Sequence, residues 1–310
     1  MIVCAYTLAR LDDTVAAVRS VLVQEPPPAE VVVVVDHNEE LRAALSERLG
    51  DDAIIVANRE QQGLSGARNT GVRASTGDIA VFLDDDATAR PGWLSALTAP
   101  FASREVIGVG GHAIPRWEAE PPRWFPGEFL WVVGCSYDGM VQAGPARNPI
   151  GCNMAFRRDA FVAAGVFASG VGRIGRRPLG CEETEFAIRA RRAMPGSRVE
   201  IAPDAVVDHL VPATRGSVRY FVSRCYGEGL SKAVIRALCD EEATEAERRY
   251  AARTLPAGVR RELRSALAFR DPLASVARVG ALIGGLAVAG AGFVRGRLGT
   301  HRGVATASRP

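Results

Sequence analysis

The chain has 310 residues, a formal net charge of +3 and 47% hydrophobic residues, which is ordinary for a globular protein of one large or two small domains. Its six cysteines are scattered and form no Cys-x-x-Cys pair, which argues against a disulfide framework or a zinc site and favours reduced thiols in a cytosolic protein. Residues 2–6 already have the pattern of a strand with no basic segment before it, so we expect no secretory signal and a cytoplasmic location.

The first half of the chain alternates strand and helix patterns, as an open parallel sheet requires. Short apolar runs predict strands, and apolar residues at helical spacing predict helices. The predicted strands are 3–6, 31–35, 54–57 and 79–83, and the predicted helices are 14–23, 41–49 and 67–74. From Gly110-Gly111 through the Pro- and Trp-rich stretch 115–131 we expect irregular structure that covers a substrate.

Three aspartates, Asp84, Asp85 and Asp86, directly follow the apolar run 79–83, which has the pattern of a central strand covered on both faces. The carboxyl end of such a strand is where α/β proteins bind ligands. Because side chains alternate along an extended segment, we expect Asp84 and Asp86 on one side and Asp85 on the other. Two neighbouring carboxylates repel each other unless a cation lies between them, and their oxygens suit Mg²⁺ or Mn²⁺. An isolated triplet would more often be an acidic turn, so the metal interpretation depends on the other motifs.

The charge is unevenly distributed. From Arg248 to the end there are twelve arginines and only two acidic residues, so this tail carries about +10 and the rest of the chain about −7. The tail has only three aromatic residues among its twelve arginines, Tyr250, Phe269 and Phe293, which argues against nucleic acid as a partner.

An uncharged segment, 279–294, lies within this basic tail, between Arg278 and the pair Arg295 and Arg297. As a helix its sixteen residues would span about 24 Å, less than the hydrocarbon core of about 30 Å, and its glycines would weaken it further. We therefore expect residues 273–298 to dock on the anionic cytoplasmic face of the cell membrane as a peripheral anchor. The alternatives are a core helix and a flexible tail.

Residues 170–175 match the pattern Gly-x-Gly-x-x-Gly of dinucleotide-binding folds. No strand leads into the match and no acidic residue follows about twenty positions later, so we predict that it is not a dinucleotide site.

Several motifs, taken in order, resemble those of family 2 glycosyltransferases, which are inverting enzymes of the GT-A fold. The matching segments are 2–10, 31–36, 63–71 and 82–86, then the acceptor-side segment 148–158 and the acidic base motif 182–186 with Arg189 after it. Two further segments, 115–158 and 224–232, are similar to polyprenyl-phosphate-linked glucuronosyltransferases.

The resemblance covers about residues 1–232 and implies an α/β fold of the GT-A type, a Rossmann-like, mostly parallel sheet flanked by helices. We expect a glycosyltransferase domain over 1–238 and a C-terminal helical, membrane-associating region over 239–310.

The resemblance also implies a site for a nucleoside diphosphate sugar, with UDP as the expected nucleotide. Its binding residues would be Thr7, Arg10, Asp36, Arg68, Asp84 and Asp85. Asp86 would be the main ligand of Mn²⁺ or Mg²⁺, with Asp84 and His209 beside it. For Asp36 a turn-capping role, and for Arg68 a solvated side chain, are the ordinary alternatives.

For catalysis, Glu183 is the expected general base, and its neighbour Glu182 is the alternative, because consecutive side chains diverge and only one can meet the acceptor hydroxyl. A glutamate here could equally stabilise the start of a helix running to Arg192. On the acceptor side the expected residues are Arg147, Asn148 and Asn153. Arg147, Arg157 and Arg158 could pair with an acceptor phosphate or a donor carboxylate, or be surface charges.

We therefore expect a metal-dependent inverting glycosyltransferase that transfers a sugar to a hydroxyl of a lipid-linked or glycan acceptor in cell-envelope glycan synthesis. A sugar-nucleotide nucleotidyltransferase and a non-catalytic sugar-nucleotide binding protein are the alternatives. The former would need a phosphate loop rich in Gly, Arg and Lys near the first strand, and the latter would not need the pair Glu182-Glu183. Processive synthases carry a Gln-x-x-Arg-Trp motif after the base motif. A processive synthase is therefore disfavoured, because no tryptophan follows residue 131.

Overall fold

The computed structural model describes residues 1–169, 180–239 and 245–307, and the side chains up to residue 298. Its contacts group the described residues into two units, which we describe separately. The α/β unit lies within Met1–Ile114, Val141–Arg176 and Glu182–Leu210, and the helical unit lies within Pro115–Met140, Arg177–Cys181 and Val211–Pro310. The predicted division at residue 238 differs from this grouping, which assigns residues 115–140 and the long helix from Val218 to the helical unit.

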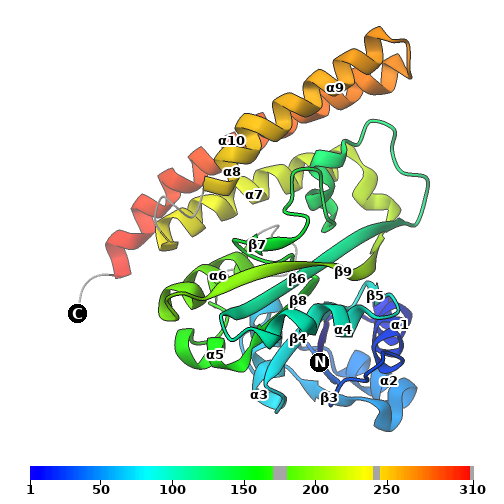
Figure 1. The fold of residues 1–310 in the computed structure, drawn as a ribbon, viewed down its shortest axis with the longest axis vertical. Coiled ribbons are helices and arrows are strands. Elements are labelled where there is room, and N and C mark those ends of the chain that lie inside the picture. Colours follow the sequence, from blue (N-terminus) through cyan, green and yellow to red (C-terminus); the bar gives the residue numbers. More distant parts are fainter. Residues whose placement is uncertain (170–179, 240–244, 308–310) are drawn as a thin grey trace. The chain divides into compact units, whose positions relative to one another are not determined.

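The α/β unit is built on a mixed nine-stranded sheet with β7 paired to β9 outside the main order β3-β2-β1-β4-β8-β6-β9-β5 (Figure 1). The strands are β1 Ile2–Ala5, β2 Val32–Val35, β3 Ile54–Ala57, β4 Ile79–Asp84, β5 Ala87–Ala89, β6 Val106–Trp117, β7 Gly144–Ala146, β8 Asn153–Arg157 and β9 Arg198–Val211. Strands β3, β2, β1 and β4 pair in parallel, and β8 pairs antiparallel with both β4 and β6.

Helices cover both faces of this sheet, which explains why its central strands are apolar throughout. One face packs against α1 Leu11–Leu22, α2 Glu39–Leu49 and α4 Trp93–Thr98, and the other packs against α3 Leu64–Ala74, α5 Arg158–Ala164 and α6 Glu182–Ala193. Helix α3 can approach β1 and β2 closely because Gly71 has no side chain, and a Cβ there would lie 2.4 Å from Ile2. The α/β fold predicted from the sequence is confirmed.

The seven elements predicted in the first half are all present, with ends that differ by at most three residues. The expected irregular structure from Gly110-Gly111 is wrong, because both glycines lie inside the long strand β6. They serve close packing: a Cβ at Gly111 would lie 1.9 Å from the carbonyl oxygen of Ala205, and one at Gly110 would lie 2.6 Å from Pro149. Sequence alone interprets two glycines as a break, whereas here they admit neighbouring backbone.

The helical unit contains four α-helices among its described residues: α7 Val218–Cys239, α8 Glu245–Arg249, α9 Leu255–Leu267 and α10 Pro272–Ala307 (Figure 1). Short 3-10 helices at Gly127–Val133 and Ala213–Gly216 precede them, and a π-helical turn at Tyr250–Thr254 joins α8 to α9. Helix α10 packs along α7 and α9. Its residue Leu282 is buried in a cluster with Phe129, Phe221 and Leu255.

Helix α10 is longer than the uncharged segment 279–294. The length of that segment alone led us to expect that it is too short to span a membrane. Its part Pro272–Leu298 is long and apolar enough to cross a bilayer, and only 22% of its most apolar stretch is buried in the protein. The helix continues through Arg278 and Arg295 because charged residues do not end a helix. Its glycines do not only weaken it: at Gly292 a Cβ would lie 2.2 Å from the carbonyl oxygen of Tyr226, so this glycine lets α10 lie against α7.

Candidate active site

The aspartate triplet lies at the carboxyl end of β4, between β1 and β8 in the sheet. Leu83 packs on the face covered by α1, and Phe82 packs on the face covered by α3. Because side chains alternate along a strand, Asp84 lies on the α3 face and is the last residue of β4. Asp85 and Asp86 form the turn into β5.

Three possible metal ligands converge at this turn. The side-chain ligand atoms of Asp84, Asp86 and His209 all lie within 4.8 Å of one another. His209 comes from β9, and its antiparallel pairing with β5 places it opposite Ala87, the residue after Asp86. His209 Nε2 lies 3.2 Å from Asp86 Oδ1, and both side chains are 3% exposed, compared with 30% for Asp84. The structure therefore brings together the three ligands named from the sequence.

This set of donors fits a divalent cation. Two carboxylates suit Mg²⁺ or Mn²⁺, and the imidazole nitrogen favours a transition metal such as Mn²⁺ over Mg²⁺, which prefers oxygen ligands. Asp84, Asp86 and His209 would hold the ion.

Arg10, at the end of a 3-10 helix that follows β1, pairs with the triplet from the α1 face. Its Nη1 donates to Asp85 Oδ1 at 2.7 Å, and its Nη2 lies 3.0 Å from Asp86 Oδ2. Asp85 is buried, and its Oδ2 has no hydrogen-bond partner among the described residues. Burial and the neighbouring Asp86 raise the pKa of Asp85 to about 7, although Arg10 opposes this shift. Arg10 thus offsets negative charge of Asp85 and Asp86 at the candidate metal site.

Arg68 connects the metal site to the predicted base motif. Its Nη1 donates to Glu182 Oε1 at 2.7 Å, and its Nη2 donates to Asp84 Oδ1 at 3.3 Å and to the carbonyl of Gly151 at 2.8 Å. Burial lowers the pKa of Arg68, but the charges of Glu182 and Asp84 outweigh this effect and leave it above its ordinary value. The side chain is only 2% exposed. The alternative of a solvated arginine is therefore wrong, and the contacts of its terminal nitrogens are with the protein.

Glu182 and Glu183 open helix α6 and differ sharply in their surroundings. Glu182 is buried against Arg68, whereas Glu183 is half-buried. Glu183 Oε1 accepts a hydrogen bond from Thr184 Oγ1 at 3.1 Å, and a Cβ at Gly151 would lie 3.7 Å from Glu183 Oε2. The second glutamate therefore lies beside the same loop that Arg68 contacts, with part of its side chain open to solvent.

The two predicted nucleotide contacts at the ends of β1 and β2 already bond to the protein. Asp36 is buried and accepts hydrogen bonds from Asn58 Nδ2 at 2.6 Å and from the backbone N–H of Gly63 at 2.9 Å. It thereby fixes the loop that begins α3. Thr7 caps the 3-10 helix that carries Arg10, by accepting from Ala9 N at 3.4 Å.

On the acceptor side, the structure corrects the expectation for Asn153. Its side chain is fully buried, Nδ2 donates to the carbonyls of His112 and Ala205, and Oδ1 accepts from Trp93 Nε1 at 2.9 Å. This amide joins β8 to β6, β9 and α4, so it leaves no group for an acceptor. Arg147 and Asn148 are half-buried and bond to each other at 2.8 Å.

The open question about two further arginines is answered by their backbone partners. Arg157 donates to the carbonyls of Val106 and Ser103, and Arg158 donates to those of Gly77 and Val72. Both are therefore structural residues rather than phosphate ligands or free surface charges. The Gly-x-Gly-x-x-Gly match at 170–175 lies outside the described residues.

Sequence reasoning did not single out Gly151, whose carbonyl oxygen accepts a hydrogen bond from Arg68 Nη2 at 2.8 Å. Gly151 lies beside both Arg68 and Glu183, and a Cβ there would lie 3.5 Å from Arg68 Nη2. The only signal for it was its position inside the segment 148–158. The bond from Arg10 to Asp85 had no local signal, because 75 residues separate the partners.

Comparison with known proteins assigns the chain to a family. The family model described as "Glycosyl transferase family 2" matches residues 1–163. A glucosyl-dolichyl phosphate glucuronosyltransferase of Haloferax volcanii is 34% identical over 239 residues, which is 76% of each chain. The succinoglycan biosynthesis protein ExoM of Rhizobium meliloti is 29% identical over 234 residues, 73% of this chain and 71% of that one.

Among solved structures, a mannosyltransferase of Pyrobaculum calidifontis, PcManGT, in complex with GDP-Man and Mn²⁺, matches with a TM-score of 0.56. It is 20% identical, and the match covers 93% of this chain and 86% of that one. At this identity the likeness supports the fold, which agrees with the GT-A architecture expected from the sequence. Together with the family match over more than half of the chain, these findings show that the chain belongs to glycosyl transferase family 2 and is a glycosyltransferase.

Proposed function

We propose that this enzyme transfers a sugar, with inversion, from a UDP-linked donor to a hydroxyl of a lipid-linked acceptor. The observation that carries the proposal is the chain of contacts from the metal-ligand set through Arg68 to the base motif. Asp84 belongs to the ligand set and bonds to Arg68, which bonds to Glu182, the neighbour of Glu183. One cluster thus holds groups for both the leaving diphosphate and the attacking hydroxyl.

Glu183 is the proposed general base. The acceptor hydroxyl would lose its proton to this carboxylate while its oxygen attacks the anomeric carbon and the bond to the nucleoside diphosphate breaks. Glu182 is held by Arg68 and is buried, so it is less suited to reach an acceptor. Because the proposed transfer inverts the anomeric carbon, an α-linked donor would give a β-linked product. Nucleotidyl transfer and non-catalytic binding, the alternatives from the sequence, are not supported by the family match.

A bound divalent cation, with Mn²⁺ favoured over Mg²⁺ by the imidazole of His209, would neutralise the charge that develops on the departing diphosphate. The chain's own contribution is to hold the ligands in place. Arg10 pairs with Oδ2 of Asp86, and Arg68 pairs with Oδ1 of Asp84. The metal-bearing mannosyltransferase of similar fold supports this assignment.

A relative and the surroundings of the site support the proposed donor and acceptor. The Haloferax volcanii relative acts, by its name, on glucosyl-dolichyl phosphate and transfers glucuronate. We propose a UDP-hexose or UDP-hexuronate donor, bound near Thr7, Asp36 and Asp85, and an acceptor that lies near Arg147 and Asn148.

A lipid-linked acceptor requires the enzyme to work at a membrane. We propose that α10 associates with the anionic cytoplasmic face, because its part Pro272–Leu298 is apolar and mostly exposed. Its exposed residues include Val276, Ile283 and Val294. The proposed association is compatible with its packing on α7, since that contact uses the opposite, glycine-bearing side of the helix.

The test is a donor and acceptor panel. UDP-glucose, UDP-galactose, UDP-glucuronate, UDP-N-acetylglucosamine and GDP-mannose would be assayed with Mn²⁺ and a glycosylated polyprenyl phosphate, and product would be identified by mass spectrometry. We expect transfer from one UDP-sugar, abolished by EDTA and restored by Mn²⁺. Transfer from GDP-mannose alone would contradict the proposed nucleotide, and transfer that persists in EDTA would contradict the metal.

A further inference from the structure

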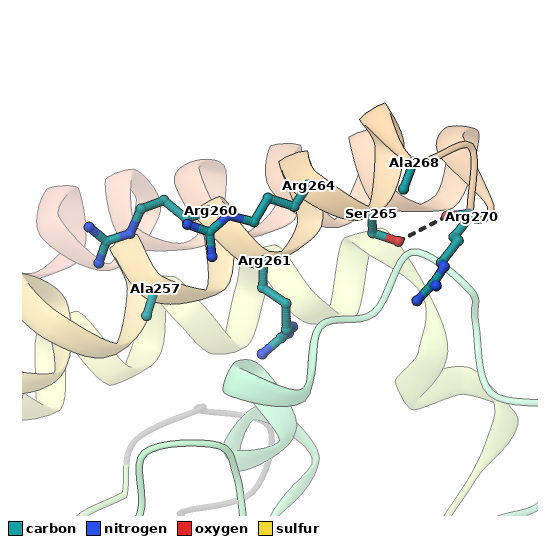
Figure 2. A pocket seen from close by; sticks show the side chains of 7 residues that line it. All are labelled: Ala257, Arg260, Arg261, Arg264, Ser265, Ala268 and Arg270. Atoms are coloured by element: carbon teal, nitrogen blue, oxygen red, sulfur yellow. Dashed lines mark hydrogen bonds between the residues drawn. The ribbon is translucent and has the colours of Figure 1, made fainter.

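The helical unit carries a second candidate binding site, far along the sequence from the aspartates. A pocket of about 770 Å³ opens beside α9 (Figure 2). Its lining is Ala257, Arg260, Arg261, Arg264, Ser265, Ala268 and Arg270. Four of these seven residues are arginines and none is acidic, so the pocket is strongly cationic.

Three of the four arginines have no counter-charge within the described part of the chain. Arg261 lies 3.1 Å from Glu128 Oε1 and is thereby neutralised. Arg260, Arg264 and Arg270 are exposed, and no ion pair joins them to any described residue. Three guanidinium groups gathered around one hollow repel one another, and an anionic ligand would relieve that repulsion.

Large apolar side chains surround the same end of α9. Leu267, Phe269 and Leu273 are 79%, 87% and 86% exposed, and they flank the turn between α9 and α10. On α9, positions 260, 263, 264 and 267 have the spacing of one helical stripe, so leucine and arginine alternate along it. A soluble anion would satisfy the arginines and leave this apolar surface in water.

We propose that the pocket and the turn after it form a docking site for an anionic phospholipid bilayer. Arg260, Arg264 and Arg270 would bind the phosphates of the headgroups, while Leu267 and Phe269 enter the acyl region below them. The arrangement of a basic stripe beside exposed leucine and phenylalanine is that of an interfacial helix. The inference rests on the proposed function, since that places the enzyme at a membrane, and it names the residues that hold it there.

The experiment measures cosedimentation of the full-length chain with vesicles of phosphatidylcholine alone or with about one-third phosphatidylglycerol. The charge variant is R260Q/R264Q, and its matched control is R104Q/R191Q, which removes two exposed arginines from the α/β unit. Each arginine near an anionic surface contributes about fivefold to binding, so we expect the charge variant to lose about 30-fold in partitioning to the anionic vesicles. The control should lose much less.

A second pair of variants tests the apolar part. L267Q/F269Q should weaken binding to the anionic vesicles by about tenfold or more. The salt dependence of the binding should stay the same, because this variant removes only apolar burial. V23Q/V162Q alters two residues of similar exposure, 76% and 80%, on the α/β unit and should bind as the parent does. All four altered positions are exposed, so thermal melting should show that each variant folds.

Free phosphate is the competing ligand, and a separate arm distinguishes it. If inorganic phosphate raises the melting temperature of the parent but not of R260Q/R264Q, while both bind anionic vesicles equally, the pocket holds a soluble anion and the bilayer assignment is overturned. If L267Q/F269Q abolishes a dimer seen by light scattering and leaves vesicle binding intact, the surface joins two copies of the chain and the assignment is again wrong.

The outcomes also distinguish this inference from the proposed function. Anionic vesicle binding that both variant pairs leave unchanged overturns the α9 site but keeps the enzyme at the membrane through α10. A parent chain that binds no vesicle, yet transfers sugar to a short-chain soluble acceptor, removes the membrane location and leaves the chemistry of the active site.

Discussion

Arg68 and Glu182 form a buried ion pair at 2.7 Å that joins helix α3 to the first turn of helix α6. The two residues are 114 positions apart in sequence. Because Arg68 also bonds to Asp84, the ion pair fixes the base motif relative to the candidate metal site. We infer that Arg68 is a positioning residue for both.

We expect R68Q to destabilise the protein by about 3 kcal/mol, because it leaves the Glu182 carboxylate buried without its partner. The double variant R68Q/E182Q should recover part of that loss, since the neutral amide no longer needs a counter-charge. Denaturant unfolding of the two single variants and the double variant measures the coupling. R42Q, which breaks the exposed pair with Glu39, is the control and should cause no measurable loss. Strict additivity of R68Q and E182Q would show that the pair does not act as a unit.

The metal site makes a prediction about ion binding apart from turnover. D86N should weaken Mn²⁺ binding by more than about 100-fold, because Asp86 is the buried carboxylate next to His209. Isothermal titration or Mn²⁺ paramagnetic resonance measures this directly. D204N removes an exposed carboxylate from the same strand as His209 and should bind Mn²⁺ as the parent does. Equal affinity in D86N would disprove the ligand assignment.

The two glutamates of α6 should separate by kind of effect. E183Q should lower turnover by about 100-fold or more and leave donor affinity and stability nearly unchanged, because only proton transfer is lost. E182Q should lower stability more than E183Q does, since it alters the buried partner of Arg68. A greater fall in turnover for E182Q at equal stability would transfer the role of base to Glu182.

Acid pH should weaken the helical unit through Glu228 of α7. Burial raises the pKa of this carboxylate, but Lys232, at 3.1 Å, and Arg224 outweigh it, so the pKa is below its ordinary value of 4.5. The ion pair therefore adds stability above that value, and the stability is lost as the pH falls through the lowered pKa of the folded state. E228Q should lower the melting temperature at pH 7 and have little effect at the acid end. An equal effect at both pH values would mean that charge is not involved.

Two glycines of α10 provide a matched comparison. At Gly292 a Cβ would lie 2.2 Å from the backbone oxygen of Tyr226, so G292A should push α10 away from α7 and cost about 1 to 3 kcal/mol. At Gly290 a Cβ would meet nothing within 4 Å, so G290A should stabilise the helix by about 0.5 to 1 kcal/mol. Thermal unfolding of the purified variants measures both. Similar effects at the two positions would show that α10 is not held closely against α7.

Local patterns in the sequence determined the α/β class, the strand that ends at Asp84 and the family. A run of apolar residues such as 79–83 predicts a buried central strand, because only a strand covered on both faces needs apolar residues at every position. The motifs around Asp86 and Glu183 were recognisable because each is a short contiguous segment. We also expected Asp84, Asp86 and His209 to converge, because the resemblance implied one metal site that includes all three.

The tertiary structure decided which charged side chain meets which, because such contacts join residues far apart in sequence. The residue types of Asn153 and Arg68 do not show whether these side chains face a ligand or the core. Only the packing of β8 and α3 shows that both are buried. Gly111 looked like a break and proved to be a point of close contact, since a strand can approach another backbone only where no side chain intervenes. The difference between Glu182 and Glu183 likewise depends on the position of Arg68, which no local pattern encodes.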